Sequence, residues 1–274
     1  MPKIVAFCNQ KGGVGKTTSV INLGTYLAQA GKRVLIVDFD PQGNATSGLG
    51  IDKTSVISSS YDLVLGQASA EELMLSTAVD NLRVIPSNLN LTGAEIELVE
   101  TMGREQCLER ALGKFIDLFD FIFVDSPPSL GLLTINVLTA ADSVIIPVQC
   151  EYYALEGLSQ LINTVDLVKE RLNPTLEIEG VLLTMADFRT NLTEEVIQEA
   201  RGFFKEKTFK TVIPRSIRLS EAPGFGQPIA LYSERSLGAV KYQELAREFL
   251  ERNTISISSP ENEPLDQELK NITY

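Results

Sequence analysis

The sequence contains no histidine and only three cysteines among its 274 residues. Without His, the chain can form neither a Ser-His-Asp nor a Cys-His nucleophile, and no imidazole can act as a general base or a metal ligand. Cys8, Cys107 and Cys150 form no CxxC pair, which argues against a zinc or iron–sulfur site within one chain. An odd number of cysteines also gives no disulfide framework and indicates a reducing compartment. The chemistry must therefore come from Lys, Asp, Thr and backbone amides.

Long apolar segments are also absent. The first seven residues lack the apolar core and cleavage site of a signal peptide, and no stretch approaches the ~18 uninterrupted apolar residues of a membrane span. A hydrophobic fraction of 44% and a charged fraction of 22% are ordinary for a globular protein and argue against wholesale disorder. We therefore expect a soluble, cytoplasmic protein without a membrane partner.

Short runs rich in Val, Ile and Phe alternate with segments long enough for helices. Several runs are apolar at nearly every position, which is typical of parallel strands covered on both faces. Alternating strands and helices indicate βαβ units, hence an α/β fold with a mostly parallel sheet. The expected strands are Lys3–Cys8, Arg33–Phe39, Leu82–Pro86, Phe121–Asp125, Ser143–Gln149, Glu179–Thr184 and Thr211–Pro214. The expected helices are Gly15–Ala30, Ala94–Val99, Glu105–Leu118, Leu130–Ala140, Leu155–Leu172, Leu192–Phe204 and Ala239–Glu251.

The chain shows no internal repeat and no Gly-, Ser- or Pro-rich linker, so residues 1–253 are expected to form one domain. After Asn253 the sequence becomes polar, Pro-containing and acidic. Such a composition cannot bury enough apolar surface to order itself. Residues 254–274 are therefore expected to form an acidic tail without fixed structure.

A glycine-rich segment, Lys11-Gly12-Gly13-Val14-Gly15-Lys16-Thr17-Thr18, follows the first expected strand and opens a helix. Glycines let successive backbone N–H groups point at phosphate oxygens, and the helix adds its positive N-terminal end. Lys16 would reach the β- and γ-phosphates of a nucleotide, and the Thr17 hydroxyl would ligate Mg²⁺. The usual GxxxxGK[ST] pattern has Gly where this chain has Gln10, but a second lysine, Lys11, opens the loop.

Carboxylates follow two other expected strands. Asp38 and Asp40 end the second strand, and Asp125 ends the fourth. Ligands of open parallel sheets bind at the carboxyl ends of the strands, so these side chains are expected beside the phosphate loop. Asp125 is placed like the Walker B Asp that holds Mg²⁺ directly or through water. Asp40 is the better candidate for orienting the attacking water and joining the metal site, although spacing leaves open whether Asp38 or Asp40 faces the phosphates.

The glycine-rich segment resembles the deviant Walker A motif of the ParA/MinD superfamily. Residues 38–46, 125–131 and 147–158 resemble further motifs of that superfamily, and the last two point to the chromosomal ParA (Soj) branch. The similarity extends from about residue 2 to 250. It implies a P-loop NTPase-like, three-layer fold with helices on both faces of the sheet.

The resemblance also implies a function. It implies a Mg²⁺-dependent ATPase that forms a nucleotide-sandwich homodimer with ATP, in which Lys11 reaches the phosphates of the partner. Nucleotide contacts are implied for Gly12 to Thr18 and for Asp125, with Pro214 and Arg215 nearer the adenine. The ATP dimer of this family binds double-stranded DNA non-specifically, and a ParB-type centromere-binding partner stimulates hydrolysis to ADP and release of DNA. Such a protein is bacterial or archaeal and associates with the nucleoid.

The net charge of −12 argues against DNA binding unless it is unevenly distributed. Residues 1–185 carry a net charge of −10, whereas residues 201–218 carry six Lys and Arg against one Glu. A local basic face is sufficient for non-specific DNA binding. The helix dipole alone could account for Arg201, Lys205 and Lys207, which end a helix that begins with acidic residues. Following the family pattern, Arg189 and Arg218 are expected to contact DNA phosphates.

Three other functions are known alternatives for a nucleotide-binding fold of this kind. A MinD-like ATPase that binds membranes would need a basic amphipathic helix at the C-terminus, but the last expected helix mixes both charges and its apolar stripe looks like core. An iron–sulfur carrier or reductase on the same fold would need cysteines at a dimer interface. A nucleotide-gated DNA scaffold or transcription regulator differs from a partitioning ATPase only in its cellular role, which the sequence does not separate.

Overall fold

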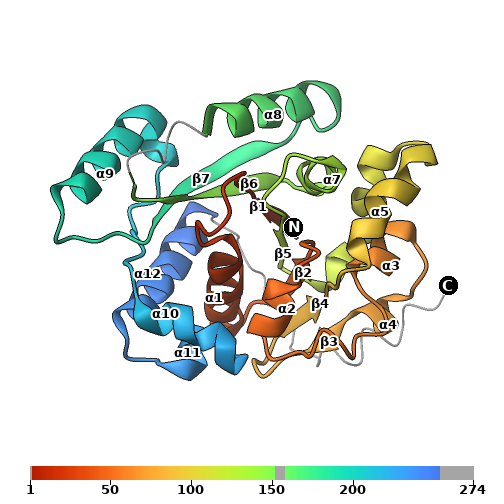
Figure 1. The fold of residues 1–274 in the computed structure, drawn as a ribbon, viewed down its shortest axis with the longest axis horizontal. Coiled ribbons are helices and arrows are strands. Elements are labelled where there is room, and N and C mark those ends of the chain that lie inside the picture. The colour runs from red at the N-terminus through yellow and green to blue at the C-terminus, as the bar shows by residue number, and fades with distance from the viewer. Residues whose placement is uncertain (1, 152–157, 254–274) are drawn as a thin grey trace.

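The computed structural model describes residues 2–151 and 158–253, and a seven-stranded sheet forms its centre (Figure 1). The strand order is β3-β4-β2-β5-β1-β6-β7, and only the pairing of β3 with β4 is antiparallel. This confirms the expected α/β fold with a mostly parallel sheet. The strands are β1 (Lys3–Phe7), β2 (Val34–Asp38), β3 (Leu75–Ser76), β4 (Leu82–Ile85), β5 (Phe121–Asp125), β6 (Ser143–Gln149) and β7 (Glu177–Thr184).

Helices cover both faces of the sheet and make the fold three-layered (Figure 1). Successive strand side chains point to opposite faces, so Ala6 packs in one core cluster while Val5 and Phe7 pack in the other. One face is covered by α3 (Ser60–Leu65), α5 (Leu91–Glu97), α6 (Cys107–Leu112), α7 (Leu132–Ala140), α8 (Leu158–Arg171) and α9 (Asn191–Phe204). The other is covered by α1 (Lys16–Gln29), α2 (Asn44–Gly48), α10 (Ile217–Glu221), α11 (Ile229–Tyr232) and α12 (Leu237–Arg252). No helix in the described parts of the chain is both long and apolar enough to cross a bilayer.

Some expected elements differ from the structure. The expected strand Thr211–Pro214 is wrong: this segment forms no strand and meets the sheet through one isolated bridge, Ala186 with Pro214, and a hydrogen bond from the Ile213 N–H to the Leu183 carbonyl. The expected helix Glu105–Leu118 is broken at Gly113, and only its α6 part is α-helical. The short elements β3, α2, α3, α4 (Ala70–Leu73), α10 and α11 were not expected, because they are too short to show a hydrophobic period. Residues 155–157 of another expected helix and the expected tail, 254–274, lie outside the described residues.

An aromatic cluster fixes α12 against the sheet. The ring of Phe249 lies 5.3 Å from that of Phe121 and 5.8 Å from that of Phe123, both in edge-on geometry. All three side chains are fully buried. Edge-to-face ring pairs add to the stabilisation that burial alone provides. α12 is therefore packed against β5, the strand that ends at Asp125.

Replacing Phe249 with alanine should lower the free energy of unfolding by about 3–5 kcal/mol, because it leaves a cavity in the core. Chemical denaturation would measure this change. Leu237→Ala on the same helix is the matched control: Leu237 is 59% exposed, so its loss should change stability by no more than about 0.5 kcal/mol. Equal losses in the two variants would contradict the packing role of Phe249.

Candidate nucleotide-binding site

The segment between β1 and α1, the phosphate loop, has the backbone conformation expected of a phosphate-binding loop. Gly15 precedes the first residue of α1 with φ 86°, and Gly13 has φ 73°. Residues with a Cβ rarely adopt this left-handed conformation, which explains glycine at both positions. The loop thus leads into the N-terminus of α1, whose free N–H groups favour an anion. The structure brings the expected strand, loop and helix together in the expected order.

Side chains from two other strands anchor this loop. The Asn9 side chain donates to the carbonyl of Pro147 (2.7 Å) and accepts the backbone N–H of Lys11 (3.0 Å). Thr184, at the end of β7, donates to the carbonyl of Val14 (2.8 Å). These bonds tie backbone groups of the loop to β6 and β7. Neither anchor was predicted from the sequence. The only signals were that Asn9 is a polar residue directly after an apolar strand and that Thr184 is a polar residue at the end of another.

Lys16 lies at the centre of the site. Its side chain is buried and its Nζ lies 3.4 Å from the carbonyl oxygen of Lys11. Burial lowers the pKa of Lys16, and the negative charge of Asp125 opposes that shift. A buried cation facing carboxylates is a strong binding group for phosphate oxygens, because few water molecules screen it.

Asp125 and Thr17 form a pair suited to Mg²⁺. The Thr17 hydroxyl donates to Asp125 Oδ2 (2.6 Å), whereas the buried Asp125 Oδ1 has no hydrogen-bond partner among the described residues. Burial, followed by the charge of Asp38, raises the pKa of Asp125 well above its usual range. A cation would relieve this cost. Mg²⁺ usually keeps several waters and is held by one or two carboxylates, which is the kind of ligand set that this pair could provide.

The structure separates the environments of Asp38 and Asp40. Asp40 lines the cavity beside the phosphate loop, and its Oδ1 accepts the backbone N–H of Gln42 (2.9 Å). Asp38 does not line that cavity; it is fully buried and its carboxylate accepts the backbone N–H and the hydroxyl of Thr46. Burial raises the pKa of Asp38 to about 6. Asp40 is therefore the carboxylate placed to meet a ligand, which the sequence left open.

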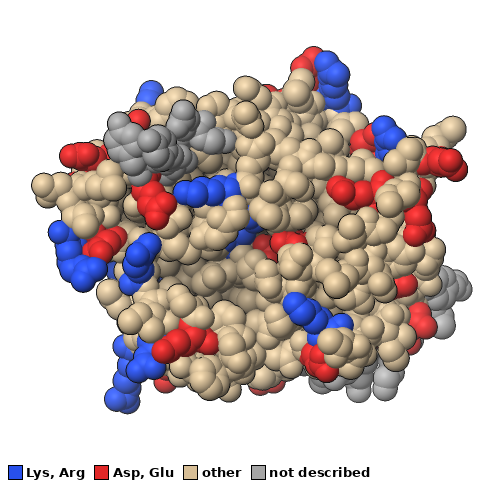
Figure 2. All heavy atoms as spheres, viewed as in Figure 1, with Lys and Arg blue, Asp and Glu red and all other residues tan. Residues whose placement is uncertain are grey.

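Two cavities meet at Gly15 and Thr18. One, of about 480 Å³, is lined by the phosphate loop and Asp40. The other, of about 520 Å³, is lined by Pro214 and Arg215 together with apolar side chains. Figure 2 shows the molecule hollowed near the middle of the viewed face, with basic and acidic atoms inside the hollow. One cavity thus lies beside the phosphate loop and Asp40, and the other lies beside Pro214 and Arg215.

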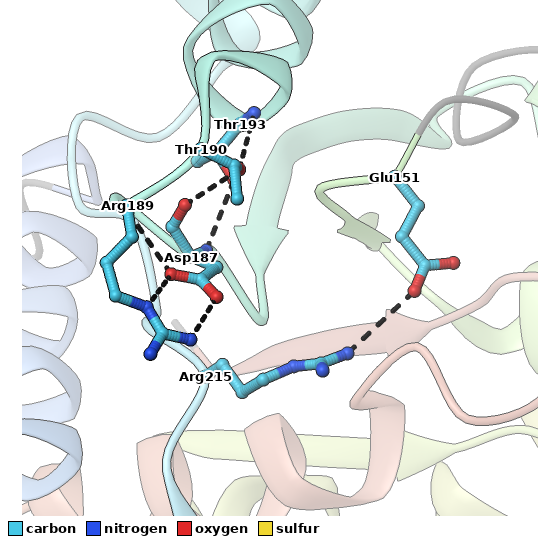
Figure 3. A network of polar contacts seen from close by, with 6 residues as sticks. All are labelled: Glu151, Asp187, Arg189, Thr190, Thr193 and Arg215. Atoms are coloured by element: carbon cyan, nitrogen blue, oxygen red, sulfur yellow. Dashed lines mark hydrogen bonds and ion pairs between the residues drawn. The ribbon is translucent and has the colours of Figure 1, made fainter.

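Glu151 links two expected site residues, Lys11 and Arg215 (Figure 3 shows its contact with Arg215). Its carboxylate lies 3.3 Å from Lys11 Nζ and 3.9 Å from an Arg215 Nη. All three side chains are about half exposed. Such exposed pairs contribute little stability, so Lys11 can leave Glu151 at small cost. No role for Glu151 was predicted from the sequence.

Arg189 and Arg218 are both exposed, with 86% and 58% of their side chains accessible. Arg189 lies before α9 and donates to both carboxylate oxygens of Asp187 at 2.7 and 2.5 Å (Figure 3). This pairing lowers the pKa of Asp187 to about 2. Arg218 on α10 pairs with Glu221 at 3.0 Å. Both arginines are accessible, and each has a carboxylate that a phosphate would have to displace.

Cysteine chemistry has no place at this site. Burial raises the pKa of Cys8 to about 12 and that of Cys150 to about 11, so both thiols stay protonated near neutral pH. All three cysteines are free and buried.

Comparison with known proteins identifies the family. A family model described as "AAA domain" matches residues 2–178. The sporulation initiation inhibitor protein Soj of Bacillus subtilis is 61% identical over 248 residues, which are 90% of this chain and 98% of that protein. The chromosome partitioning protein ParA of Myxococcus xanthus is 52% identical, over 92% of this chain and 89% of that protein.

Solved structures agree with the fold. A structure named cobyrinic acid a,c-diamide synthase of Mycobacterium smegmatis, with bound ADP and magnesium, superposes with a TM-score of 0.82 at 36% identity, over 96% of this chain and all of that one. The cell division ATPase MinD of Pyrococcus furiosus gives 0.77 at 26% identity, over 92% of this chain and 99% of that one. With its deviant Walker A loop, its parallel sheet and these relatives, the chain belongs to the ParA/MinD superfamily, in the branch of the chromosome-partitioning ParA (Soj) proteins.

Proposed function

We propose that the chain is a DNA-partitioning ATPase that hydrolyses ATP to ADP and phosphate with Mg²⁺. One observation carries this proposal: the phosphate loop and Asp40 line one cavity, and Asp125 accepts a hydrogen bond from Thr17, one of the residues that line it. A second cavity, lined by Pro214 and Arg215, adjoins the first. The names of the relatives, Soj and ParA, and the nucleotide and magnesium bound in a structural neighbour support it. The site contains the cation, the carboxylates and the N–H groups that phosphoryl transfer requires.

Each residue of the site has a role in this proposal. Backbone N–H groups of Gly12 to Thr18 and the Lys16 ammonium bind the phosphates. Thr17 and Asp125, with Asp40 nearby, would hold Mg²⁺, which supplies charge neutralisation on the phosphate oxygens when bound. Asp40 orients the attacking water, because no histidine exists to do so. Pro214 and Arg215 lie beside the adenine.

Lys11 completes the site of a second copy in an ATP-bound homodimer. Its side chain is half exposed and bound only to Glu151 among the described residues, so it is free to reach outward. A cation supplied in trans stabilises the charge that develops on the transferred phosphoryl group. Dimerisation would therefore exchange the weak contact with Glu151 for a stronger contact with phosphate.

The ATP dimer is proposed to bind double-stranded DNA non-specifically through Arg189 and Arg218. A ParB-type partner would stimulate hydrolysis and release the DNA, and the protein would associate with the nucleoid in the cytoplasm. The dimer carries twice as many phosphate contacts as one copy. Because the dimer forms only with ATP in this proposal, DNA affinity depends on ATP.

The alternative of a MinD-like membrane-binding ATPase has less support. α12, the last described helix, buries its apolar stripe, including Tyr242, Leu245 and Phe249, in the core. Its exposed face mixes basic and acidic residues. A helix that binds a membrane surface needs a free apolar face.

Lys16→Ala should weaken ATP and ADP binding by about 10- to 100-fold, because a charge-assisted contact to phosphate is lost. Isothermal titration or a fluorescent nucleotide would measure the affinity. Lys32→Ala, which removes the same charge just beyond the other end of α1, is the control and should bind normally. Undiminished affinity in Lys16→Ala would refute the assignment of the phosphate site.

Asp40→Ala should retain ATP binding but lower the rate of hydrolysis by about 100- to 10,000-fold, because the attacking water is no longer oriented. The variant should therefore remain as a dimer on DNA in the presence of ATP. Release of phosphate and DNA co-sedimentation would test both effects. Asp80→Ala, which removes an exposed carboxylate between β3 and β4, serves as the control. Normal turnover in Asp40→Ala would exclude the water-orienting role.

The double variant Arg189→Ala/Arg218→Ala should bind DNA more weakly and reduce the slope of log affinity against log salt by about two per chain, while ATP binding is preserved. Lys169→Ala/Arg171→Ala, in the last turn of α8, removes equal charge elsewhere and should leave the slope unchanged. Asp187→Asn removes the carboxylate that competes for Arg189 and should bind DNA at least as tightly as the wild type. An unchanged slope in the first variant would move the DNA-binding face to other residues.

A further inference from the structure

The segment that holds Asp40 leads into a helix without an ordinary N-terminal cap. Gly43 precedes α2, has φ 62° and carries no side chain to accept a hydrogen bond. A Cβ at this position would lie 2.8 Å from the carbonyl oxygen of Ser87, so the close approach of the two loops requires glycine. The N–H groups at the start of α2 must therefore find an acceptor elsewhere.

Asp38, at the end of β2, supplies that acceptor. Its Oδ2 accepts the backbone N–H of Thr46 at 2.7 Å and the Thr46 hydroxyl at 2.7 Å. Its Oδ1 accepts the backbone N–H of Asp40 at 3.3 Å. Asp38 and Thr46 are both fully buried. One carboxylate thus fixes the backbone of Asp40 and the first turn of α2 in relation to each other.

The Thr46 hydroxyl extends this arrangement to β4. It donates to Asp38 and accepts the backbone N–H of Ser87 at 2.9 Å, just after β4 ends. A hydroxyl at this position is both donor and acceptor, so only Ser or Thr can make both contacts. Without it, the Ser87 N–H and one oxygen of Asp38 would lose a buried hydrogen bond.

We infer that Thr46 is a positioning residue for ATP hydrolysis. Its hydroxyl orients the Asp38 carboxylate between β2 and β4, and Asp38 in turn fixes the backbone of Asp40. Thr46 does not line the nucleotide cavity, whereas its neighbours Asn44 and Ser47 do, so it acts through Asp38 and not on the nucleotide. This inference rests on the proposed function, because it assigns Asp40 to the hydrolytic step. It goes beyond that function in naming the residues that hold Asp40 in place.

Thr46→Val removes the hydroxyl at nearly constant volume and keeps the backbone N–H. Single-turnover hydrolysis of ATP, with protein in excess and duplex DNA present, separates the chemical step from binding. We expect the rate to fall about tenfold or more, because small displacements of a catalytic group are costly, while the ATP dissociation constant stays within about threefold. Thr46→Ser keeps the donor and acceptor and should restore most of the rate.

Thr139→Val is the matched control. Thr139 is also a buried threonine, but its hydroxyl has no hydrogen-bond partner in the described structure and it lies on α7. Its rate should equal that of the wild type. Thermal unfolding of each variant would show whether Thr46→Val is folded. If it is not, the rate of Thr46→Ser, which keeps the hydroxyl, provides the test.

Three results would overturn the inference: a wild-type rate in Thr46→Val, an equal loss in Thr46→Ser, or an ATP affinity that falls as much as the rate. None of these results would contradict the proposed ATPase function, as long as the wild-type chain hydrolyses ATP. A wild-type chain that binds DNA with ATP but never hydrolyses it would remove the inference and the proposed function together.

Discussion

The parallel register of β1, β5 and β2 is the constraint on which the site depends. Phe7 pairs with Asp125, and Asp125 pairs with Asp38, so the three strands end in one row. The phosphate loop leaves β1 at this row, and the segment that carries Asp40 leaves β2 beside it. A shift of β2 or β5 by one residue would turn its terminal carboxylate to the other face of the sheet. The burial of the strands on both faces makes such a shift costly.

The buried carboxylates give the site its electrostatic character. Asp38 and Asp125 are fully buried and both have raised pKa values, so they stay ionised only at a cost in free energy. Asp38 recovers part of that cost from its three hydrogen bonds, whereas Asp125 Oδ1 has none among the described residues. This difference supports the proposal that Asp125 binds a cation, whereas Asp38 has a structural role. Lys16, the cation between the loop and these acids, would bring the phosphates to the same place.

The sequence predicted the sheet and the placement of Thr17, Asp40 and Asp125 near the phosphate loop, because both depend on local signals. Apolar runs mark buried strands, and the glycine-rich segment between Phe7 and Lys16 has a fixed strand–loop–helix context. The segment Thr211–Pro214 shows where this reasoning fails: it is largely apolar, yet it forms no strand and contacts the backbone at the end of β7 and at Ala186 just after it. The anchors Asn9 and Thr184, and the contact between Thr46 and Ser87, join residues far apart in the chain. No spacing rule predicts such contacts, because only the packed fold brings the residues together.

The central claim is that ATP controls contact with DNA through this site. Co-sedimentation of the wild-type chain with duplex DNA in the presence of ATP, ADP or no nucleotide tests it most directly, with anionic liposomes as a parallel sample. The account predicts that the protein sediments with DNA only when ATP is present and never with liposomes. Equal DNA binding in all three nucleotide states, or ATP-dependent sedimentation with liposomes alone, would contradict it.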